Sequence, residues 1–372
     1  MNTGGRPAEG SAPQSEGQAH AAVGTDPEPS GPELSRPELS TQMLDRAARR
    51  LLGGELVAFP TETVYGLGAD AENPDAVARI YEAKGRPSNH PVIVHVAPDA
   101  DLSYWARSIP SVAHALVQAF WPGPLTLILP RASNISPAVS GGQDSIGLRC
   151  PSHPVAQELL RRFAALKGGQ GGVAAPSANK FGQVSPTQAA HVRHEFPELD
   201  DSTLLVLEGG PSHVGIESTI LDLSRLDEGM GPVLLRPGHV SAQELAAVLG
   251  VMPARPDAAA PRVSGSLKAH YAPRTPLVLA SRGQAESLSA GGAPERTVVV
   301  MFPPLPDGIA AAAGVTRLMC SPDPAEYAKQ LYALLRELDD GAYGRIVMER
   351  PPATPEWQAV NDRLGRAAAA FE

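Results

Sequence analysis

Two short polar segments hold the side chains that are best suited to bind a small charged ligand. Thr61-Glu62-Thr63 follows the apolar run at residues 56–59, which predicts a buried strand that stops at Pro60 and leads through a polar turn to a helix. Lys84-Gly85-Arg86-Pro87 combines a point charge with a flat guanidinium, and this pair can hold a polyphosphate. The same residues are also typical of turn caps and of cations at a helix C-terminus, so both interpretations stay open.

Further polar side chains stand at the ends of predicted strands, where ligands bind in open α/β sheets. Arg149 closes a strand at residues 145–149 and could receive a carboxylate, although an arginine there is more often a solvated rim residue. His95 alternates with two valines, and such a histidine alone is more often a sheet-face residue than a catalytic one. The other candidates of this kind are Ser177, Asn179, Ser185, Ser218 and Arg236.

These side chains favour one kind of chemistry. The chain has no Gly-Lys-Ser/Thr phosphate loop, no HExxH and no GxSxG, and no Ser, Cys or His has an obvious activating partner in sequence. Cations, hydroxyls and amides bind and orient anions instead. They favour phosphoryl or nucleotidyl transfer by positioning over covalent catalysis.

The composition narrows the class of protein. The 372 residues carry a formal net charge of −9, which argues against a general nucleic-acid coat. Cys150 and Cys320 form no CxxC, so neither a zinc site nor a disulfide framework is expected, and Cys150 is predicted to be a buried thiol. No apolar run approaches the roughly 18 residues that span a bilayer, and the N-terminus has no apolar signal core. We therefore expect a soluble, cytoplasmic protein without a membrane partner.

Apolar periodicity predicts an α/β fold, a twisted mixed sheet with helices packed on it. Strands are expected at residues 56–59, 92–96, 125–129, 145–149, 173–175, 204–207, 219–223 and 233–235. Helices are expected from Met43 to Leu52 and at residues 74–84, 111–120, 154–166, 186–195 and 241–249. Near the C-terminus, strands at 277–280, 297–302, 315–319 and 345–348 alternate with helices at 322–338 and 355–369. That alternation predicts a small Rossmann-like unit, which lacks GxGxxG.

These elements divide the chain into four parts. Residues 1–35 are rich in Gly, Pro, Ser and Glu and are predicted to be a disordered tail. Residues 36–250 form the first α/β domain, and residues 251–276 are a linker rich in Pro, Ala, Arg and Ser. The Rossmann-like domain takes residues 277–372.

Six sequence blocks in the same order resemble the YrdC-like family. They are residues 59–68, Lys84-Gly85-Arg86-Pro87, and residues 121–126, 175–179, 215–219 and 235–238. Any one block alone would be weak evidence, whereas six in order are specific. The added linker and C-terminal domain resemble the long, two-domain form of this family, the threonylcarbamoyl-AMP synthases.

The resemblance implies a twisted α/β sheet around a large, positively lined cavity. It implies a nucleotidyltransferase that joins L-threonine, bicarbonate and ATP into L-threonylcarbamoyladenylate and releases pyrophosphate. Mg²⁺ would be held by ATP and not by the protein, and no tightly bound organic cofactor is expected. The product would pass to a downstream tRNA threonylcarbamoyl transferase complex, which forms N6-threonylcarbamoyladenosine at position 37 of tRNAs.

The family's binding residues fall on defined positions of this chain. Its signature of lysine, arginine, serine and asparagine falls on Lys84, Arg86, Ser177 and Asn179. Its threonine-binding positions match Thr63, His95, Arg149 and Ser218. Its ATP-binding positions match Arg86, His90, Ser145, Ala175, Ser177, Ser185 and Arg236, beside Lys84 and Asn179 of the signature.

Two positions depart from the family's pattern. His90 stands where some members carry asparagine. In the linker, residues 264–273 resemble a segment whose first tyrosine touches the nucleotide, but here Lys268 takes the place of that tyrosine. We expect Lys268 to reach phosphate instead of stacking on the base.

Two alternative functions remain. Some members of the family bind double-stranded RNA, so an RNA- or tRNA-binding module without catalysis is the first alternative, and weak RNA binding could also accompany catalysis. The second is the hydrogenase-maturation carbamoyltransferase, which shares the YrdC-like domain. That protein needs zinc-finger cysteines, which two cysteines cannot supply.

Overall fold

The computed structural model describes residue 1 and residues 40–293, 295–305 and 312–372. The predicted disordered tail, residues 1–35, therefore lies outside the described residues apart from Met1. From residue 40 onward the described residues belong to one compact unit. No helix in these ranges is long and apolar enough to cross a bilayer.

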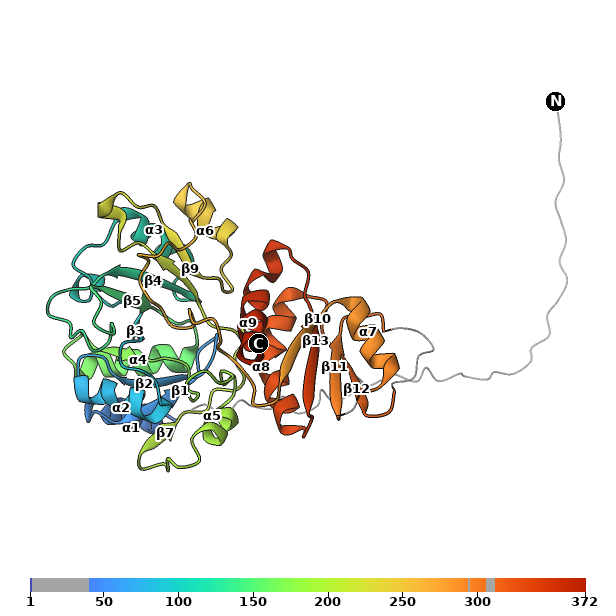
Figure 1. Cartoon of the computed structure of the whole chain (residues 1–372). Coiled ribbons are helices and arrows are strands. Elements are labelled where there is room, and N and C mark those ends of the chain that lie inside the picture. Colours follow the sequence, from blue (N-terminus) through green and yellow to red (C-terminus); the bar gives the residue numbers. More distant parts are fainter. Residues whose placement is uncertain (2–39, 294, 306–311) are drawn as a thin grey trace. The chain divides into compact units, whose positions relative to one another are not determined.

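The larger of two sheets has nine strands in the described ranges (Figure 1), in the order β7-β1-β2-β6-β3-β5-β4-β8-β9. The pairs β1–β7, β3–β5 and β4–β8 are parallel and the others are antiparallel, so the predicted mixed sheet is confirmed. The strands are β1 (Leu56–Phe59), β2 (Gly66–Asp70), β3 (Ile93–Val96), β4 (Leu125–Pro130), β5 (Ser145–Arg149), β6 (Gly172–Ala174), β7 (Leu204–Val206), β8 (Thr219–Asp222) and β9 (Val233–Arg236).

Helices cover both faces of this sheet. Val57 and Phe59 of β1 pack in one apolar cluster with α1 and α4, whereas Leu56 and Ala58 pack in another with α2. Because both faces of β1 are buried, the strand reads as a continuous apolar run and not as an alternation. The helices of this part are α1 (Thr41–Leu52), α2 (Pro74–Lys84), α3 (Ser111–Phe120), α4 (Pro154–Leu166), α5 (Ala189–Glu195) and α6 (Ala242–Leu249).

The turn after β1 differs from the sequence prediction. Residues 60–65 do not lead to a helix but to β2, which pairs antiparallel with β1. A Cβ at Gly68 would lie 2.8 Å from the Phe59 ring and 2.8 Å from Val173, so only glycine lets β2 lie between these side chains. Gly66 and Gly68 are residue types typical of turns, but here they allow a crowded strand. The polar residues 61–63 therefore sit in a buried loop between two strands.

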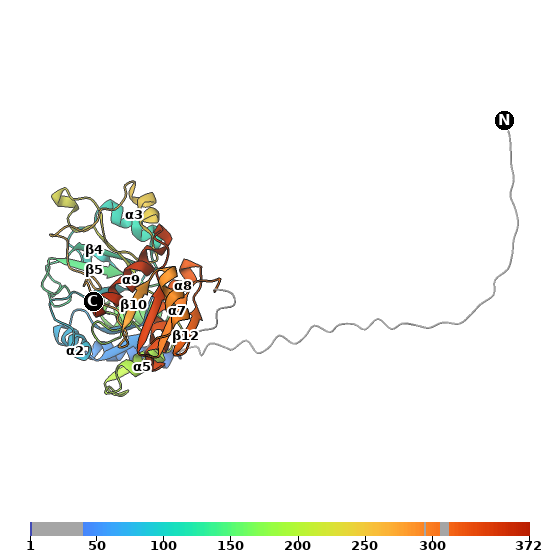
Figure 2. The same ribbon diagram turned by 45° about the vertical axis from the view of Figure 1, so that its right-hand side comes forward.

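The smaller sheet has four parallel strands within the described part, in the order β10-β13-β11-β12 (Figure 1). Figure 2 shows the same sheet with its two outer strands, β10 and β12, labelled. They are β10 (Leu277–Ala280), β11 (Thr297–Met301), β12 (Val315–Met319) and β13 (Arg345–Glu349), with helices α7 (Arg282–Gly291), α8 (Pro324–Asp340) and α9 (Gln358–Ala368). The predicted Rossmann-like alternation is confirmed. Helix α7 was not predicted, because its sequence RGQAESLSAG carries little apolar periodicity; a capping box at Ser281 begins it.

Candidate functional site

Loops at the ends of the strands surround one cavity, with an empty volume of about 570 Å³ including its opening to solvent. Four cations from three separate segments line it: Lys84 and Arg86, Arg149, and Arg236. Thr63, His95, Ala175, Ser177, Asn179 and Ser218 line the same cavity. The structure thus brings together ten of the predicted binding residues, including all four of the threonine set.

Lys84 is placed by the end of α2. Gly85 takes the left-handed conformation, with φ of 61°, and terminates the helix directly after Lys84. The Lys84 ammonium donates hydrogen bonds to the backbone oxygens of Ser177 and Asn179, with 2.6 Å to Ser177. Burial and the nearby Arg86 charge lower the pKa of Lys84 well below its usual range. An anion in the cavity would favour the charged form of this lysine.

Arg86 connects three segments of the cavity wall. Its Nη2 donates to the backbone oxygen of Pro91 at 2.8 Å and to Oγ of Ser264 in the linker at 3.0 Å. Its guanidinium carbon lies 5.7 Å from the centre of the Phe181 ring. Burial lowers the pKa of Arg86 to about 10, so it remains charged at neutral pH.

Arg149 is held by Glu62, a residue of the first polar segment. Nη2 of Arg149 donates to Oε1 of Glu62, and Nε donates to the backbone oxygen of Gly123. The other oxygen of Glu62 accepts a hydrogen bond from the Ser152 backbone. Nη1 of Arg149 makes no hydrogen bond to any residue that the structure describes, so this end of the guanidinium is left for a ligand.

Ser218 and Arg236 form a second polar group in the cavity. Arg236 donates from Nε and Nη2 to the backbone oxygen of Ser218, at 3.0 and 2.9 Å, and from Nη2 to its Oγ at 3.1 Å. The Ser218 hydroxyl also lies 2.8 Å from the hydroxyl of Thr126. From its Nη1, Arg236 reaches the backbone oxygen of Ser264. Two of the three cations of the nucleotide set, Arg86 and Arg236, thus contact the linker.

Several buried polar atoms of the cavity wall have no hydrogen-bond partner in the described ranges. They are Nε of Arg86, Nδ1 of His95, Oδ1 of Asn179, Nδ1 of His270 and the hydroxyl of Tyr271. Buried polar groups in native proteins are almost always satisfied, and an unsatisfied one is costly. Their concentration around one cavity is therefore a sign that a polar ligand completes it.

Four predicted residues do not line this cavity. Ser145 borders a smaller neighbouring pocket, and His90 packs its ring against Phe181, with 5.4 Å between ring centres. The hydroxyl of Ser185 is fully buried and donates to Glu217 at 2.6 Å. Lys268 is 82 % exposed, and its ammonium lies 3.5 Å from the Glu372 carboxylate.

The linker reaches the cavity through residues other than Lys268. Ser264, Gly265, His270 and Tyr271 line it, and Tyr271 turns inward with a positive φ of 62°. A Cβ at Gly265 would lie 2.0 Å from the Tyr271 hydroxyl, so glycine is required there. The predicted phosphate contact of Lys268 has no support in this arrangement, because the lysine keeps its hydration and pairs at the surface.

Four residues of the wall had no role predicted from the sequence. Glu217 stands in the block at residues 215–219, from which only Ser218 was predicted to bind a ligand, and Phe181 carries no signal of its own. His270 and Tyr271 lie in the linker segment whose resemblance drew attention to Lys268 instead. These residues lie at the cavity because segments that are distant in sequence contact one another there.

The described residues offer neither a reactive cysteine near neutral pH at position 150 nor a cluster of metal ligands. Cys150 is buried, as predicted, and burial raises its pKa to about 12, which makes it a poor nucleophile. No group of three or more His, Cys, Asp or Glu side chains that could hold a metal ion occurs among the residues the structure describes.

Two family models match the chain. The model described as "Telomere recombination", of the Sua5, YciO and YrdC proteins, matches residues 49–238. The model described as "Threonylcarbamoyl-AMP synthase, C-terminal domain" matches residues 240–369. Together they cover both sheets.

Individual relatives are similar over almost the whole chain. Threonylcarbamoyl-AMP synthase of Bacillus subtilis is 38 % identical over 351 residues, which cover 89 % of this chain and 95 % of the relative. A solved structure of Pyrococcus abyssi Sua5, in which a histidine and a tyrosine are replaced by alanine, is 33 % identical with a TM-score of 0.77 and covers 90 % of this chain and 95 % of that one. A crystal structure of the same protein in complex with L-threonine has 34 % identity and a TM-score of 0.74, over 87 % of this chain and 94 % of that one.

Proposed function

The chain belongs to the threonylcarbamoyl-AMP synthase family in its two-domain form, and on this premise we propose that it joins L-threonine, bicarbonate and ATP into L-threonylcarbamoyladenylate with release of pyrophosphate. The observation that carries the proposal is the convergence of Lys84, Arg86, Arg149 and Arg236 on one cavity. Both substrates with fixed negative charge, the amino acid and the nucleotide, need such cations.

Threonine is assigned to the part of the cavity around Arg149. Its carboxylate would pair with the Nη1 end of Arg149, since Nη2 is already bound to Glu62. Thr63, His95 and Ser218 would contact its remaining polar atoms, because hydroxyls can donate and accept in turn. The crystal structure of Pyrococcus abyssi Sua5 with L-threonine supports an amino-acid site in this fold.

The nucleotide is assigned to the cations at the other loops. Lys84, Arg86 and Arg236 would hold the triphosphate, and Ala175, Ser177 and Asn179 would contact the rest of the nucleotide. Mg²⁺ enters as part of the substrate Mg·ATP. We propose that His90, Ser145 and Ser185 contact the nucleotide only after the loops that carry them move toward it, since none of the three lines the cavity in this structure.

The chemistry we propose is nucleotidyl transfer by positioning. Bicarbonate first carboxylates the threonine amine, and water leaves. An oxygen of the resulting carbamate then attacks the α-phosphorus of ATP, and the bond to pyrophosphate breaks. Fixed cations compensate charge in the transition state, and a buried cavity keeps water from the labile carbamate.

One assay tests this function. Pyrophosphate release is measured with purified full-length protein and Mg·ATP, with and without L-threonine and with and without bicarbonate. We expect release only when all three substrates are present, and we expect Lys84→Ala and Arg149→Ala each to abolish it. Release without threonine, or wild-type turnover in either variant, would refute the proposal.

The RNA-binding alternative has less support, since the family membership is that of a synthase and the chain is acidic. Transfer of the product to tRNA by a downstream threonylcarbamoyl transferase, a cytoplasmic location and weak RNA binding stay proposals. Steep salt dependence of RNA binding together with absent pyrophosphate release would favour the alternative.

A further inference from the structure

The C-terminal helices contact the cavity wall through a buried cluster around Glu217, which we call the Glu217 cluster (Ser185, Glu217, Tyr332 and Arg363). Glu217 lines the cavity and is 6 % exposed. Its Oε2 accepts hydrogen bonds from the Tyr332 hydroxyl of α8 at 2.9 Å and from Nε of Arg363 of α9 at 2.7 Å. Its Oε1 accepts from Ser185 at 2.6 Å. Each member is buried, so these bonds are shielded from water.

The charge of Glu217 is fixed by the same contacts. Burial by itself would raise the pKa of this carboxyl, but the positive charges of Arg363 and Arg236 and the hydrogen bond from Ser185 lower it to about 2. Glu217 is therefore a permanent anion beneath the cavity. Arg363 also covers the Tyr271 ring, with 5.2 Å from its guanidinium carbon to the ring centre.

The backbone beside Glu217 touches α8 directly. A Cβ at Gly215 would lie 2.4 Å from Cα of Lys329 and 2.6 Å from the backbone oxygen of Ala328. Gly215 also has a positive φ of 79°, which disfavours any other residue. The loop before β8 is thus held against α8 both by its backbone and by the Glu217 side chain.

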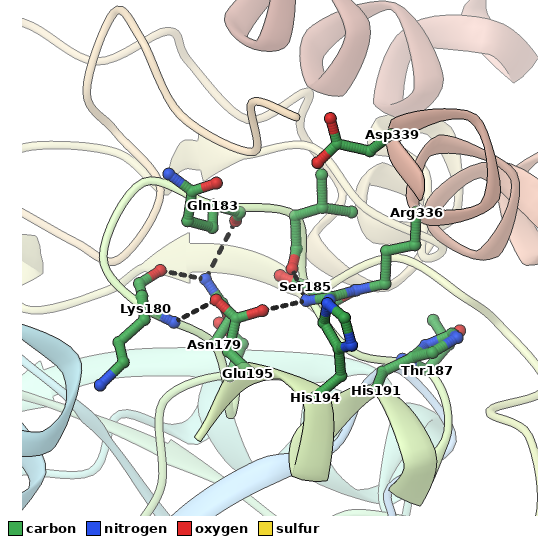
Figure 3. A network of polar contacts seen from close by, with 12 residues as sticks. Asn179, Lys180, Gln183, Ser185, Thr187, His191, His194, Glu195, Arg336 and Asp339 are labelled. Carbon is green, nitrogen blue, oxygen red and sulfur yellow. Dashed lines mark hydrogen bonds and ion pairs between the residues drawn. The ribbon is translucent and has the colours of Figure 1, made fainter. Parts of the chain in front are cut away.

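A second contact joins α8 to the loop that carries Asn179 (Figure 3). Nη2 of Arg336 donates to Oε2 of Glu195 in α5 at 2.9 Å and to the backbone oxygen of Val184. Oε1 of Glu195 accepts from the Lys180 backbone at 2.8 Å. The amide of Asn179 donates to the Lys180 and Gln183 oxygens, so the loop is closed on itself and tied to Arg336.

Apolar contacts also join the C-terminal helices to the loops of the cavity wall. The core of the C-terminal part, around Leu331 and Leu335, includes four side chains from the cavity wall and its loops: Val64, Val184, Ile216 and Tyr271. Each of them adjoins a segment that carries predicted binding residues. The helices α8 and α9 therefore support several loops of the site at once.

From these contacts we infer that the C-terminal domain sets the substrate geometry of the cavity through two separate sets of positioning residues. Tyr332, with Arg363, positions Glu217 and hence the adjacent Ser218 on the threonine side. Arg336 positions the Asn179 loop on the nucleotide side. None of these three C-terminal side chains lines the cavity, so they act through the wall and not on the substrate. The inference rests on the proposed function and adds a role for the second domain.

Simple packing of two domains would give a different result from positioning. Removal of a packing contact lowers the stability of the protein but leaves the folded fraction with unchanged affinities. Removal of a positioning contact changes the affinity of the one substrate whose loop it holds. The test therefore needs a ligand-specific readout.

The variants are chosen to keep the fold. Tyr332→Phe removes one hydroxyl that binds Glu217, and Tyr327→Phe is its control. Tyr327 lies on the same helix and is buried, but its hydroxyl has no hydrogen-bond partner in the described ranges. Arg336→Met removes the guanidinium from Glu195 and keeps an unbranched apolar chain about as long as the arginine side chain up to Nε.

The dissociation constants of L-threonine and of Mg·ATP are measured by calorimetry on full-length protein, well below the unfolding temperature of every variant. We expect Tyr332→Phe to weaken threonine about tenfold and ATP by less than twofold, relative to Tyr327→Phe. Arg336→Met should weaken ATP about tenfold and threonine by less than twofold. Equal losses for both ligands, or no loss in either variant, would overturn the inference.

Hydrogen exchange of the ligand-free protein tests the positioning without any substrate. Tyr332→Phe should raise exchange at residues 215–219, and Arg336→Met should raise it at residues 179–184, each without the other. Exchange equal to that of Tyr327→Phe in both segments would refute positioning even if the enzyme were active. A wild-type protein that binds neither ligand would instead contradict the proposed function and leave the exchange result to stand on its own.

Discussion

Nη2 of Arg149 lies 2.6 Å from Oε1 of Glu62, and both side chains are almost completely buried. Removal of one partner from a buried ion pair leaves an uncompensated charge, which costs about 3–5 kcal/mol. We expect Glu62→Ala to lower the free energy of unfolding by that amount in urea titrations. Glu158→Ala, which breaks a half-exposed pair with Arg162, should cost less than about 1 kcal/mol. Equal losses in the two variants would contradict the importance of burial.

The lowered pKa of His95 should make the stability of the protein depend on pH. Burial, with the nearby Arg149 charge, lowers the pKa of His95 to about 3 from its ordinary 6.5. Between these values the unfolded chain binds a proton that the folded chain does not, so stability falls as the pH falls from 6.5 toward 3. We expect His95→Gln to flatten this slope by up to about 1.4 kcal/mol per pH unit. The free energies of unfolding of the wild type and of His95→Gln, measured at several pH values, check this prediction. Parallel plots of free energy against pH for the two proteins would refute it.

Replacement of two glycines by alanine should change the stability of the protein in opposite directions. A Cβ at Gly68 would lie 2.8 Å from both Phe59 and Val173, so Gly68→Ala overpacks the sheet and should destabilise the protein by about 1–3 kcal/mol. Gly365 lies inside α9, is exposed and has open space around it. Gly365→Ala should stabilise the protein by roughly 0.5–1 kcal/mol. Thermal and urea unfolding of both variants measure the signs.

Arg86 should not be replaceable by lysine. Its guanidinium reaches Pro91, Ser264 and the face of Phe181 together, and the single nitrogen of a lysine cannot span these groups. We expect Arg86→Lys to raise the KM for ATP at least about tenfold, which corresponds to about 1.4 kcal/mol. Arg107→Lys, at an exposed position, serves as the control and should leave the KM for ATP unchanged. A KM unchanged in Arg86→Lys would remove Arg86 from the nucleotide site.

Lys268 gives a prediction from its exposure. Because its ammonium pairs with Glu372 at the surface, Lys268→Ala should leave the KM for ATP within about twofold of the wild type. Steady-state pyrophosphate release at varied ATP measures this. A larger increase would restore the phosphate contact that the sequence resemblance suggested, and would mean that the linker rearranges when ATP binds.

Much of the local structure could be predicted from periodicity and caps. The strands β5 and β10 and the helices α2, α3 and α4 begin and end at the predicted residues, because their apolar patterns are bounded by Pro, Gly or capping residues. Helix α5 is shorter than expected, since Pro186 does not begin it. Strand β2 was missed because Gly66 and Gly68 resemble turn residues, although they serve close packing in the sheet.

The chemistry of the site could also be predicted from the sequence, since residue types alone decide which side chains can bind anions. The sequence could not show which of these side chains share a cavity. Lys84, Arg149 and Arg236 meet only because three distant strand and helix ends are brought together by the sheet order. The same applies to Glu62 with Arg149 and to Glu217 with Arg363, whose partners lie far away in sequence. Local pattern specifies elements and charges, whereas burial and long-range pairing are properties of the packed chain.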